Sequence, residues 1–510
     1  MKIKKSILDG LLYGLLYFFL ILLFLIFEPL KEEEKTRTIQ ICMIATICIV
    51  LILSFIIYLK NKVIKNSCED VSIEKYKSKN EVIVGMAILM IGLIMRVGYT
   101  MYTPWYIRVH DVGQADLNAT GHASYILHLF YGKLPNSNGY QFYHPPFYHF
   151  LSSVTMHIVG LLKGIKEGEY LIDSAKLISC FASCGVLFQI KEFLKETDIK
   201  GKIANIIMLI VAFCPNLYLM SGRVNNDSLV FFFMVVAIRY TYKWYYNQDW
   251  KSIIILAIAY GLGMMTKTSM TVLTVFTAVF MCVVLVKNIK KHLYKMTILQ
   301  LIVFGVISLP LGLWYPIRNL ILYKQPLSYV LNLGKESPIY VGNYSMSERL
   351  LLHIKNLKNL SLFNKPIDDY NIPIYIWKGS LFGEFTLEIN NTLGWILLIS
   401  NGVLIVISII AMIAIIMKTK EKRELIYGLF FIWLCQMISY ISFNINYPHT
   451  CTMDFRYIVI TVIVGAIYIG LFCRQIERKD NVAYKMGLGF IYSATIIYAI
   501  SSMIVYLTVK

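Results

Sequence analysis

Two short segments of this sequence carry acids and histidines at a spacing that could support acid–base chemistry. Residues 108–111 read Arg-Val-His-Asp, and residues 143–149 read Tyr-His-Pro-Pro-Phe-Tyr-His. A carboxylate such as Asp111 can take a proton from an attacking hydroxyl, and the imidazoles of His110 and His144 can donate or accept hydrogen bonds. Both segments adjoin long apolar stretches, where ionisable side chains are costly and mark candidate functional sites. We therefore expect the reaction centre here.

Further charged side chains recur at the ends of later apolar stretches. They are Arg223, Asp227, Lys267, Arg318 and Arg456. Each has an ordinary alternative: the aspartate can cap a helix, the lysine can extend along apolar surface to reach water, and the arginines can anchor a helix at the membrane interface. Taken together with Asp111, four cations and two acids fit a site that binds an anionic headgroup and performs acid–base chemistry beside it.

A divalent cation is a second use for the same residue types. Histidine and carboxylate are ordinary metal ligands, so His110, Asp111, His144 and Asp227 could hold one. Their spacing in the sequence fixes no coordination geometry. We expect no obligatory metal ion.

The composition identifies a membrane protein. Of the 510 residues, 57% are hydrophobic and the mean hydropathy is +0.61, so the length counts helices of about 20 residues rather than globular domains. The net charge of +19 comes from lysines between the apolar stretches, which is typical of cytoplasmic loops and does not indicate a nucleic-acid partner. The ten cysteines lie almost entirely within the spans, so no disulfide framework is indicated.

The apolar stretches predict an all-α polytopic protein with about thirteen transmembrane helices. The expected spans are residues 11–27, 39–59, 82–99, 172–190, 203–221, 229–245, 253–266, 270–286, 297–314, 393–417, 425–443, 457–473 and 486–509.

A fourteenth apolar stretch, residues 147–162, is assigned to the outer interface. If it does not cross, the basic segments 60–79, 191–202, 287–295, 418–423 and 474–485 all face the cytoplasm, as the positive-inside rule requires. If it does cross, four strongly basic loops face outward. We therefore expect a helix lying in the outer interface, with the N-terminus inside and the C-terminus outside.

The longest polar insertion, residues 315–391, is also expected on the outer face. Within it, leucines and isoleucine alternate with charged residues over 349–360. This spacing predicts one amphipathic interfacial helix, and a packed cap without a ligand role is an equal alternative.

In their order, these motifs resemble the polyprenyl-phosphate-sugar-dependent glycosyltransferases of the GT-C superfamily, in the protein O-mannosyltransferase and aminoarabinose-transferase branch. The resemblance runs from about residue 82 to the C-terminus. The matching features are Asp111 in the first outer loop, the His-Pro-Pro segment at 144–148, Arg-x-Asn-Asn-Asp at 223–227, Thr-Lys at 266–267, Trp-x-x-x-Arg-Asn at 314–319 and Arg-Tyr at 456–457.

The resemblance implies a division of the chain. Residues 1–80 form two additional N-terminal helices, and residues 81–510 form a GT-C-like catalytic domain. Within that domain, residues 100–171 form the first outer loop with its interfacial helix, and residues 315–392 form the long outer loop. One departure matters: the mannosyltransferase branch usually has Asp-Glu at the first-loop acid, whereas Val112 follows Asp111 here, so a protein acceptor is not favoured over others.

The resemblance also implies a reaction. The donor is a single sugar on a polyprenyl phosphate, the acceptor is an envelope glycan, lipid or protein, and transfer inverts the anomeric centre on the extracytoplasmic face of a bacterial plasma membrane. Asp111 is then the general base, Lys267, Arg318 and Arg456 stabilise the lipid phosphate, and His110, His144, Arg223 and Asp227 shape the substrate site.

The alternative is a transporter or flippase for a lipid-linked or anionic solute. A transporter should carry polar groups near the middle of the membrane and often an internal repeat. Here the charges lie at one face, and the sequence shows no repeat.

Overall fold

The chain folds as a bundle of helices. The computed structural model describes residues 2–27, 32–66, 72–327, 329–365, 369–418, 421–479 and 481–509. These residues form α-helices and short 3-10 helices, with no β-strand among them. The predicted all-α class is therefore confirmed.

Twelve longer helices build the bundle. They are α1 (Lys2–Phe27), α2 (Glu32–Asn66), α3 (Ser72–Tyr102), α6 (Lys176–Glu196), α9 (Asp227–Asn247), α10 (Trp250–Thr266), α11 (Val272–Lys290), α12 (Tyr294–Tyr323), α16 (Asn391–Lys418), α17 (Arg423–Asn446), α18 (Ile460–Glu477) and α19 (Val482–Thr508).

Shorter elements connect them. The shorter α-helices are α4 (His122–Phe130), α5 (Phe147–Lys163), α7 (Gly201–Ala212), α8 (Pro215–Ser221), α13 (Met346–Leu350), α14 (Ile354–Lys358) and α15 (Ile372–Phe382). The 3-10 helices are η1 (Gly168–Tyr170), η2 (Ile172–Ala175), η3 (Thr268–Thr271), η4 (Thr450–Met453) and η5 (Phe455–Ile458).

The number of membrane spans is smaller than the sequence predicts. Ten helices are long and apolar enough to cross a membrane, or eleven if α7 and α8, which bend by 53° at their junction, count as one span. All thirteen predicted segments are helical, but α9 and α10 fall outside this set. Helix α10 has only 17 residues, and α9 carries Arg239 and Lys243 in its C-terminal half. The protein is an integral membrane protein with multiple spans, and the count of thirteen is not confirmed.

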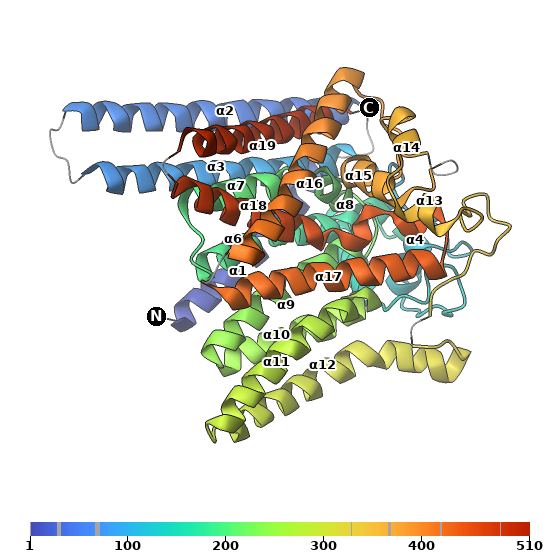
Figure 1. Ribbon diagram of the computed structural model, residues 1–510. Coiled ribbons are helices and arrows are strands. Elements are labelled where there is room, and N and C mark those ends of the chain that lie inside the picture. Colours follow the sequence, from blue (N-terminus) through green and yellow to red (C-terminus); the bar gives the residue numbers. More distant parts are fainter. Residues whose placement is uncertain are drawn as a thin grey trace.

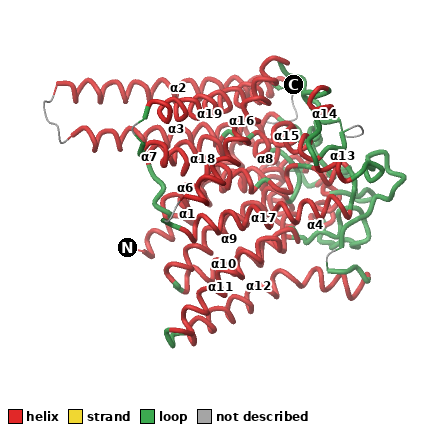
Figure 2. Tube along the Cα trace, viewed as in Figure 1, coloured by secondary structure: helices red, strands yellow, loops and turns green. Residues whose placement is uncertain are grey.

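The helices lie side by side, and their connections gather at the two ends of the bundle (Figure 1). Helices α4 and α13 to α15 lie at one end together with most of the loop structure, as Figure 2 shows in green. The α6–α7 and α18–α19 connections meet at the opposite end, where Lys200, Lys202, Arg474 and Lys485 line one cavity. The two chain termini lie toward opposite ends (Figure 1). Of the basic segments predicted for the cytoplasmic face, residues 67–71, 419–420 and 480 lie outside the described residues.

Helix α5 begins at Phe147, as predicted for the interfacial helix. It packs against α4 and η2, and it is not among the helices that could cross a membrane by length and composition. Its C-terminus is closed by Gly164 at φ 70°, a left-handed position that glycine adopts without strain. Its placement at the outer interface stays a prediction.

The prediction of a single amphipathic helix over residues 349–360 is wrong. Two one-turn helices, α13 and α14, stand there instead. Helix α13 starts at a capping box formed by Ser345 and Glu348. Leu351 and His353 then take extended backbone conformations, with ψ of 146° and 147°, which end the first helix before the second begins.

A buried arginine stabilises the bend at the junction of α7 and α8. Arg96 of α3 is fully buried and donates hydrogen bonds to the carbonyl oxygens of Ala212 (2.7 Å) and Val211 (3.2 Å), the last turn of α7. It also donates to Gly92 O and to Ser183 Oγ. These bonds satisfy carbonyls that the end of a helix leaves unpaired. The arginine therefore fixes the bend from which α8 leads to the loop of residues 221–227.

Candidate active site

Asp111 lies in a tight loop that is closed by backbone hydrogen bonds. His122 N donates to Asp111 O (3.0 Å) and Ala123 N donates to Val112 O (2.8 Å), which ties the loop to the first turn of α4. Gly113 is required in this loop because a Cβ atom there would meet Thr120 O at 1.8 Å. Asp111 itself has φ 59°, a left-handed conformation that costs free energy for a residue with a side chain. The loop thus holds the carboxylate in a defined position.

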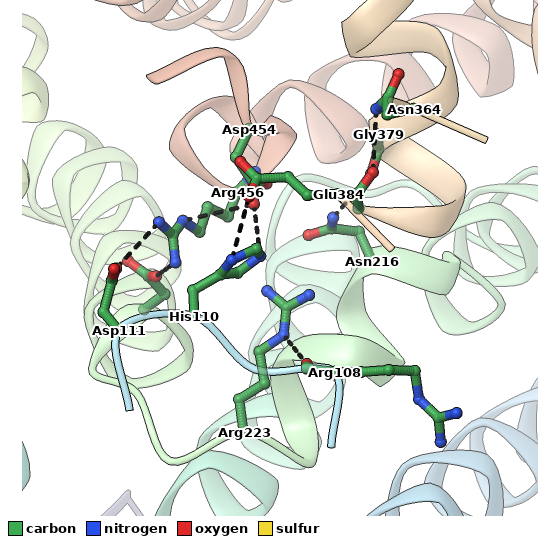
Figure 3. A network of polar contacts seen from close by, with 12 residues as sticks. Arg108, His110, Asp111, Asn216, Arg223, Asn364, Gly379, Glu384, Asp454 and Arg456 are labelled. Carbon is green, nitrogen blue, oxygen red and sulfur yellow. Dashed lines mark hydrogen bonds and ion pairs between the residues drawn. The ribbon is translucent and has the colours of Figure 1, made fainter. Parts of the chain in front are cut away.

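Arg456 lies among three carboxylates. Its Nη2 is 3.4 Å from Asp111 Oδ2, its Nη1 is 3.5 Å from Asp227 Oδ2 and its Nε is 3.6 Å from Asp454 Oδ2. Figure 3 shows the guanidinium between Asp111 on one side and Asp454 on the other. Asp454 Oδ1 also accepts the backbone N–H of Arg456 (2.8 Å), which caps η5. Arg456 Nε and Nη1 are buried and have no hydrogen-bond partner.

Lys267 is a further member of this charged group. It follows the last residue of α10 in an extended conformation, and its Nζ contacts Asp227 Oδ1 at the start of α9. Lys267 Nζ and the Arg456 guanidinium lie 5.4 and 5.1 Å from the centre of the Tyr457 ring. Both cations therefore lie over the same aromatic ring, which attracts each of them.

The electrostatic setting keeps the Asp111 carboxylate ionised. Burial alone raises its pKa, but Arg456, the hydrogen bond from the Tyr140 hydroxyl and two nearby histidines outweigh that effect and lower the pKa of Asp111 to about 2. Burial lowers the pKa of His122 to about 4. At pH 7 Asp111 is therefore an anion and His122 is neutral.

Three histidines, His122, His144 and His149, stack on one another near Asp111. His122 Nδ1 is 2.8 Å from His149 Nε2, and the rings of His122 and His144 lie 5.8 Å apart and nearly parallel. Burial and the nearby Lys267 hold the pKa of His144 well below its usual range. The His-Pro-Pro segment therefore presents a neutral, hydrogen-bonding imidazole next to the charged group.

His110 and Arg223 form a second group of contacts, around the Phe385 ring. His110 contacts Glu384 Oε2 through Nδ1 (3.3 Å) and Asp454 Oδ2 through Nε2 (3.1 Å), and its ring stacks on Phe385 at 4.8 Å. Arg223 lies over the same Phe385 ring at 5.0 Å, and its Nε donates to Arg108 O (3.1 Å). Figure 3 shows both side chains below Arg456.

Arg318 stands apart from the other predicted site residues. Its guanidinium contacts Asn319 and Tyr323 and lies over the rings of Tyr315 and Tyr323, all on its own helix α12. It does not line the cavity that Asp111, Lys267 and Arg456 share. The structure thus brings together every predicted site residue except this one.

A cavity of about 560 Å³ joins the charged group to apolar helix surfaces. Its polar wall includes Asp111, His122, His144, Lys267 and Arg456. Its apolar wall comes from α9 to α12, from Leu327 and from residues 329–333. The apolar side chains are Met234, Met264, Val272, Leu313, Leu327, Leu331 and Leu333. The shape and lining fit an amphipathic molecule with an anionic head.

The metal set considered from the sequence does not form. Asp111 and Asp227 both contact Arg456, and His144 stacks on His122 instead. Within the described ranges, one group offers three ligand atoms close enough for a single ion: His110, Glu384 and Asp454, whose ligand atoms lie within 4.8 Å of one another.

Several residues of the centre are not evident from the sequence motifs. Tyr140 and His122 are brought to Asp111 by the loop closure, and Glu384 comes from the long outer loop more than 270 positions away. The available signal for Glu384 is that it is a lone acid directly after the apolar run 372–382. Asp454 adjoins Arg456, but nothing in the sequence shows that it faces His110.

Comparison with known proteins gives one family. Residues 143–314 match the family model of dolichyl-phosphate-mannose-protein mannosyltransferase. The match includes His144, Arg223, Asp227 and Lys267, and it ends before Arg318. It confirms the predicted resemblance to polyprenyl-phosphate-sugar-dependent glycosyltransferases of the GT-C type and, with it, the expectation of a membrane glycosyltransferase.

Among solved structures, the chain is similar to the oligosaccharyltransferase of Archaeoglobus fulgidus, crystallised with a tethered acceptor peptide. The TM-score is 0.46 at 12% sequence identity, and the match covers 83% of this chain and 55% of that one. The chain therefore spans about half the length of that protein. No curated protein matches the sequence.

Proposed function

We propose that this chain, a membrane glycosyltransferase similar over residues 143–314 to the dolichyl-phosphate-mannose-protein mannosyltransferases, moves a sugar from a polyprenyl phosphate to an acceptor hydroxyl or amine with inversion. The observation that supports this most directly is the cavity that places Asp111 beside Lys267 and Arg456 at one end and apolar helix surface at the other. A lipid-linked sugar phosphate has the same division into a charged head and an apolar tail.

The reaction is a single displacement. The acceptor oxygen or nitrogen forms a bond to the anomeric carbon while the bond from that carbon to the phosphate oxygen breaks. The electron pair leaves with the polyprenyl phosphate, and the acceptor proton passes to the Asp111 carboxylate. Because attack comes from the face opposite the leaving group, the anomeric configuration inverts.

Asp111 acts as a base although its pKa is low. With a pKa of about 2, the carboxylate is too weak a base to deprotonate a neutral hydroxyl before attack. Its basicity suffices once the acceptor oxygen becomes positively charged on bonding to carbon. Base assistance of this kind typically contributes about 10²- to 10⁴-fold in rate.

Lys267 and Arg456 stabilise the leaving phosphate. Negative charge grows on the phosphate oxygens during transfer, so preformed cations lower the barrier more than they strengthen donor binding. The buried Nε and Nη1 of Arg456 have hydrogen-bond capacity left for an oxyanion. Arg318, whose hydrogen bonds and ring contacts among the described residues are with α12, is better suited to anchoring that helix.

The remaining predicted residues shape the site. Asp227 orients Lys267 and Arg456 by contacting both of them. His144 presents a neutral ring in the cavity wall, and Arg223 and His110 both pack on Phe385. The reaction is assigned to the extracytoplasmic face of a bacterial plasma membrane, which agrees with basic residues at the opposite end of the bundle. An envelope glycan, lipid or protein is then the acceptor.

A lipid-linked sugar assay tests this function. Membranes containing the wild-type protein should consume a labelled polyprenyl-phosphate sugar and form a glycosylated product, and Asp111→Asn should abolish both. Asp116→Asn, an exposed acid of the same loop, is the matched control and should retain activity. Movement of intact sugar-lipid or solute across proteoliposomes without any product, retained in Asp111→Asn, would instead identify a transporter or flippase.

A further inference from the structure

The His110 ring is held between two carboxylates. Its two nitrogens face Glu384 Oε2 at 3.3 Å and Asp454 Oδ2 at 3.1 Å. A neutral imidazole carries one N–H, so one of these contacts would set a nitrogen lone pair against an anionic oxygen. One more positive charge in this cluster makes both contacts favourable, and a bound cation can supply it.

Glu384 lacks a basic partner of its own. Arg456 contacts Asp111, Asp227 and Asp454, and Lys267 contacts Asp227, whereas Glu384 forms no ion pair with a lysine or arginine in the described part of the chain. Its Oε1 atom is buried and has no hydrogen-bond partner. Buried charges of this kind are usually paired or bound to a metal ion.

We propose that His110, Glu384 and Asp454 bind one divalent transition-metal ion in a site separate from the reaction cavity. Their ligand atoms lie within 4.8 Å of one another, so small side-chain rotations bring one nitrogen and two oxygens onto a single ion. One imidazole with two carboxylates suits Zn²⁺ or Mn²⁺ better than Mg²⁺, which prefers oxygen ligands alone. None of the three residues lines the cavity of Asp111 and Lys267.

The ion would join three distant parts of the chain. His110 belongs to the first outer loop, Glu384 follows α15, and Asp454 lies between η4 and η5. Asp454 binds the backbone N–H of Arg456 with its other oxygen, and His110 is the neighbour of Asp111 in the chain. The three ligands are therefore positioning residues: the ion fixes the two segments that carry the Asp111 carboxylate and the Arg456 guanidinium. This positioning role rests on the proposed function, but metal binding itself does not.

Direct measurement of bound metal tests the site. Full-length protein in detergent, stripped with a chelator and dialysed against Zn²⁺ or Mn²⁺, should retain one ion per chain by elemental analysis. Glu384→Gln and Asp454→Asn should each lower the affinity by more than about 100-fold, since even the outer partners of metal ligands are worth about 10- to 100-fold. Glu388→Gln, an exposed acid in the same loop, is the control and should bind like the wild type.

A second measurement covers variants that fail to fold. The wild-type protein should unfold at a higher temperature with Zn²⁺ or Mn²⁺ than after chelation, because a ligand that binds only the folded state stabilises it. Wild-type protein that retains no ion and shows no such shift would overturn the proposal. An ion retained equally by Glu384→Gln would also overturn it. Either result leaves the donor-consumption assay free to support or refute the transferase.

Discussion

Two buried arginines serve different purposes in this molecule. Arg96, fully buried within α3, donates its hydrogen bonds to Gly92 O, Val211 O, Ala212 O and Ser183 Oγ. Arg456, 7% exposed in η5, faces three carboxylates and keeps two buried nitrogens without a hydrogen-bond partner. The first guanidinium is satisfied by neutral oxygens, and the second is surrounded by charge and incompletely hydrogen-bonded.

The contrast separates a structural charge from a functional one. An ionisable group inside a membrane protein is a functional candidate by default. Arg96 shows that this default fails when neutral backbone and side-chain oxygens, two of them carbonyls at a helix break, supply the acceptors. Arg456 lines a cavity with unfilled donors, which is the arrangement that an anionic ligand can complete.

Replacing Arg456 should have the largest effect on turnover. Arg456→Met leaves Asp111 and Asp454 without a lysine or arginine partner among the described residues, and breaking a buried pair costs about 3–5 kcal/mol. We expect sugar transfer to fall by more than about 10³-fold, since both the leaving-group cation and the partner of the base are lost. Arg456→Lys should recover little, because one ammonium cannot reach three carboxylates at once. The donor-consumption rate of detergent-purified protein measures this loss. Near-normal rates in Arg456→Met would mean that Arg456, like Arg96, has a structural role.

Lys267 and Arg318 give the next effect as a matched pair. Lys267→Met removes a cation from the cavity and should lower the transfer rate by about 10²-fold, with a smaller loss of donor binding. Arg318→Met removes a cation whose hydrogen bonds and ring contacts in the described part of the chain are with α12, so its transfer rate should stay within about threefold of wild type. The two variants are compared by turnover at saturating donor and by donor affinity. Equal losses of transfer rate in the two variants would support the phosphate-binding role that the sequence predicts for Arg318.

Replacing Arg96 should affect stability more than turnover. Arg96→Met leaves the carbonyls of Ala212 and Val211 without this donor, at about 1–3 kcal/mol for each group that stays unsatisfied. We expect a lower unfolding temperature and less folded protein, while transfer per folded molecule changes by less than about threefold. Activity is therefore normalised to the monodisperse fraction in size-exclusion chromatography. A large loss of normalised turnover would show that the α7–α8 break also sets the geometry of the reaction centre.

Sequence patterns predicted the helices well and the centre in part. Apolar runs of about 20 residues locate spans because a helix in lipid must satisfy its own backbone, so all thirteen predicted segments are helical. The same patterns overcount, because they do not weigh the charges of α9 or the short length of α10. They also merged α13 with α14, since side-chain periodicity does not reveal the extended backbone at Leu351 and His353.

The residues of the reaction centre could be predicted only in part from the sequence. Charged residues at helix ends could be grouped by their expected side of the membrane, which brought Asp111, Asp227, Lys267 and Arg456 together correctly. Arg318 met the same criterion and lies elsewhere, because sidedness does not say toward which neighbour a helix face turns. Glu384 had no motif to identify it, and only the path of the long outer loop brings it to His110.

The smallest effect should appear in the pH dependence, where Tyr140 tunes Asp111. A carboxyl pKa lowered to about 2 stabilises the folded state above the ordinary value of about 3.9, and this contribution disappears as the pH falls toward 2. The kcat/KM of the wild type should therefore lose nothing to protonation of Asp111 between pH 8 and about pH 4. Tyr140→Phe removes one hydrogen bond to the carboxylate, worth about 1.5–3 kcal/mol, and should move the acid limb upward by about one to two pH units. Turnover at pH 7 should change by less than about tenfold, because Asp111 stays ionised there. An acid limb that stays in place in Tyr140→Phe would mean that Arg456 and the nearby histidines set the charge of the base without Tyr140, and the contrast between the two arginines would then be sharper than the contacts alone indicate.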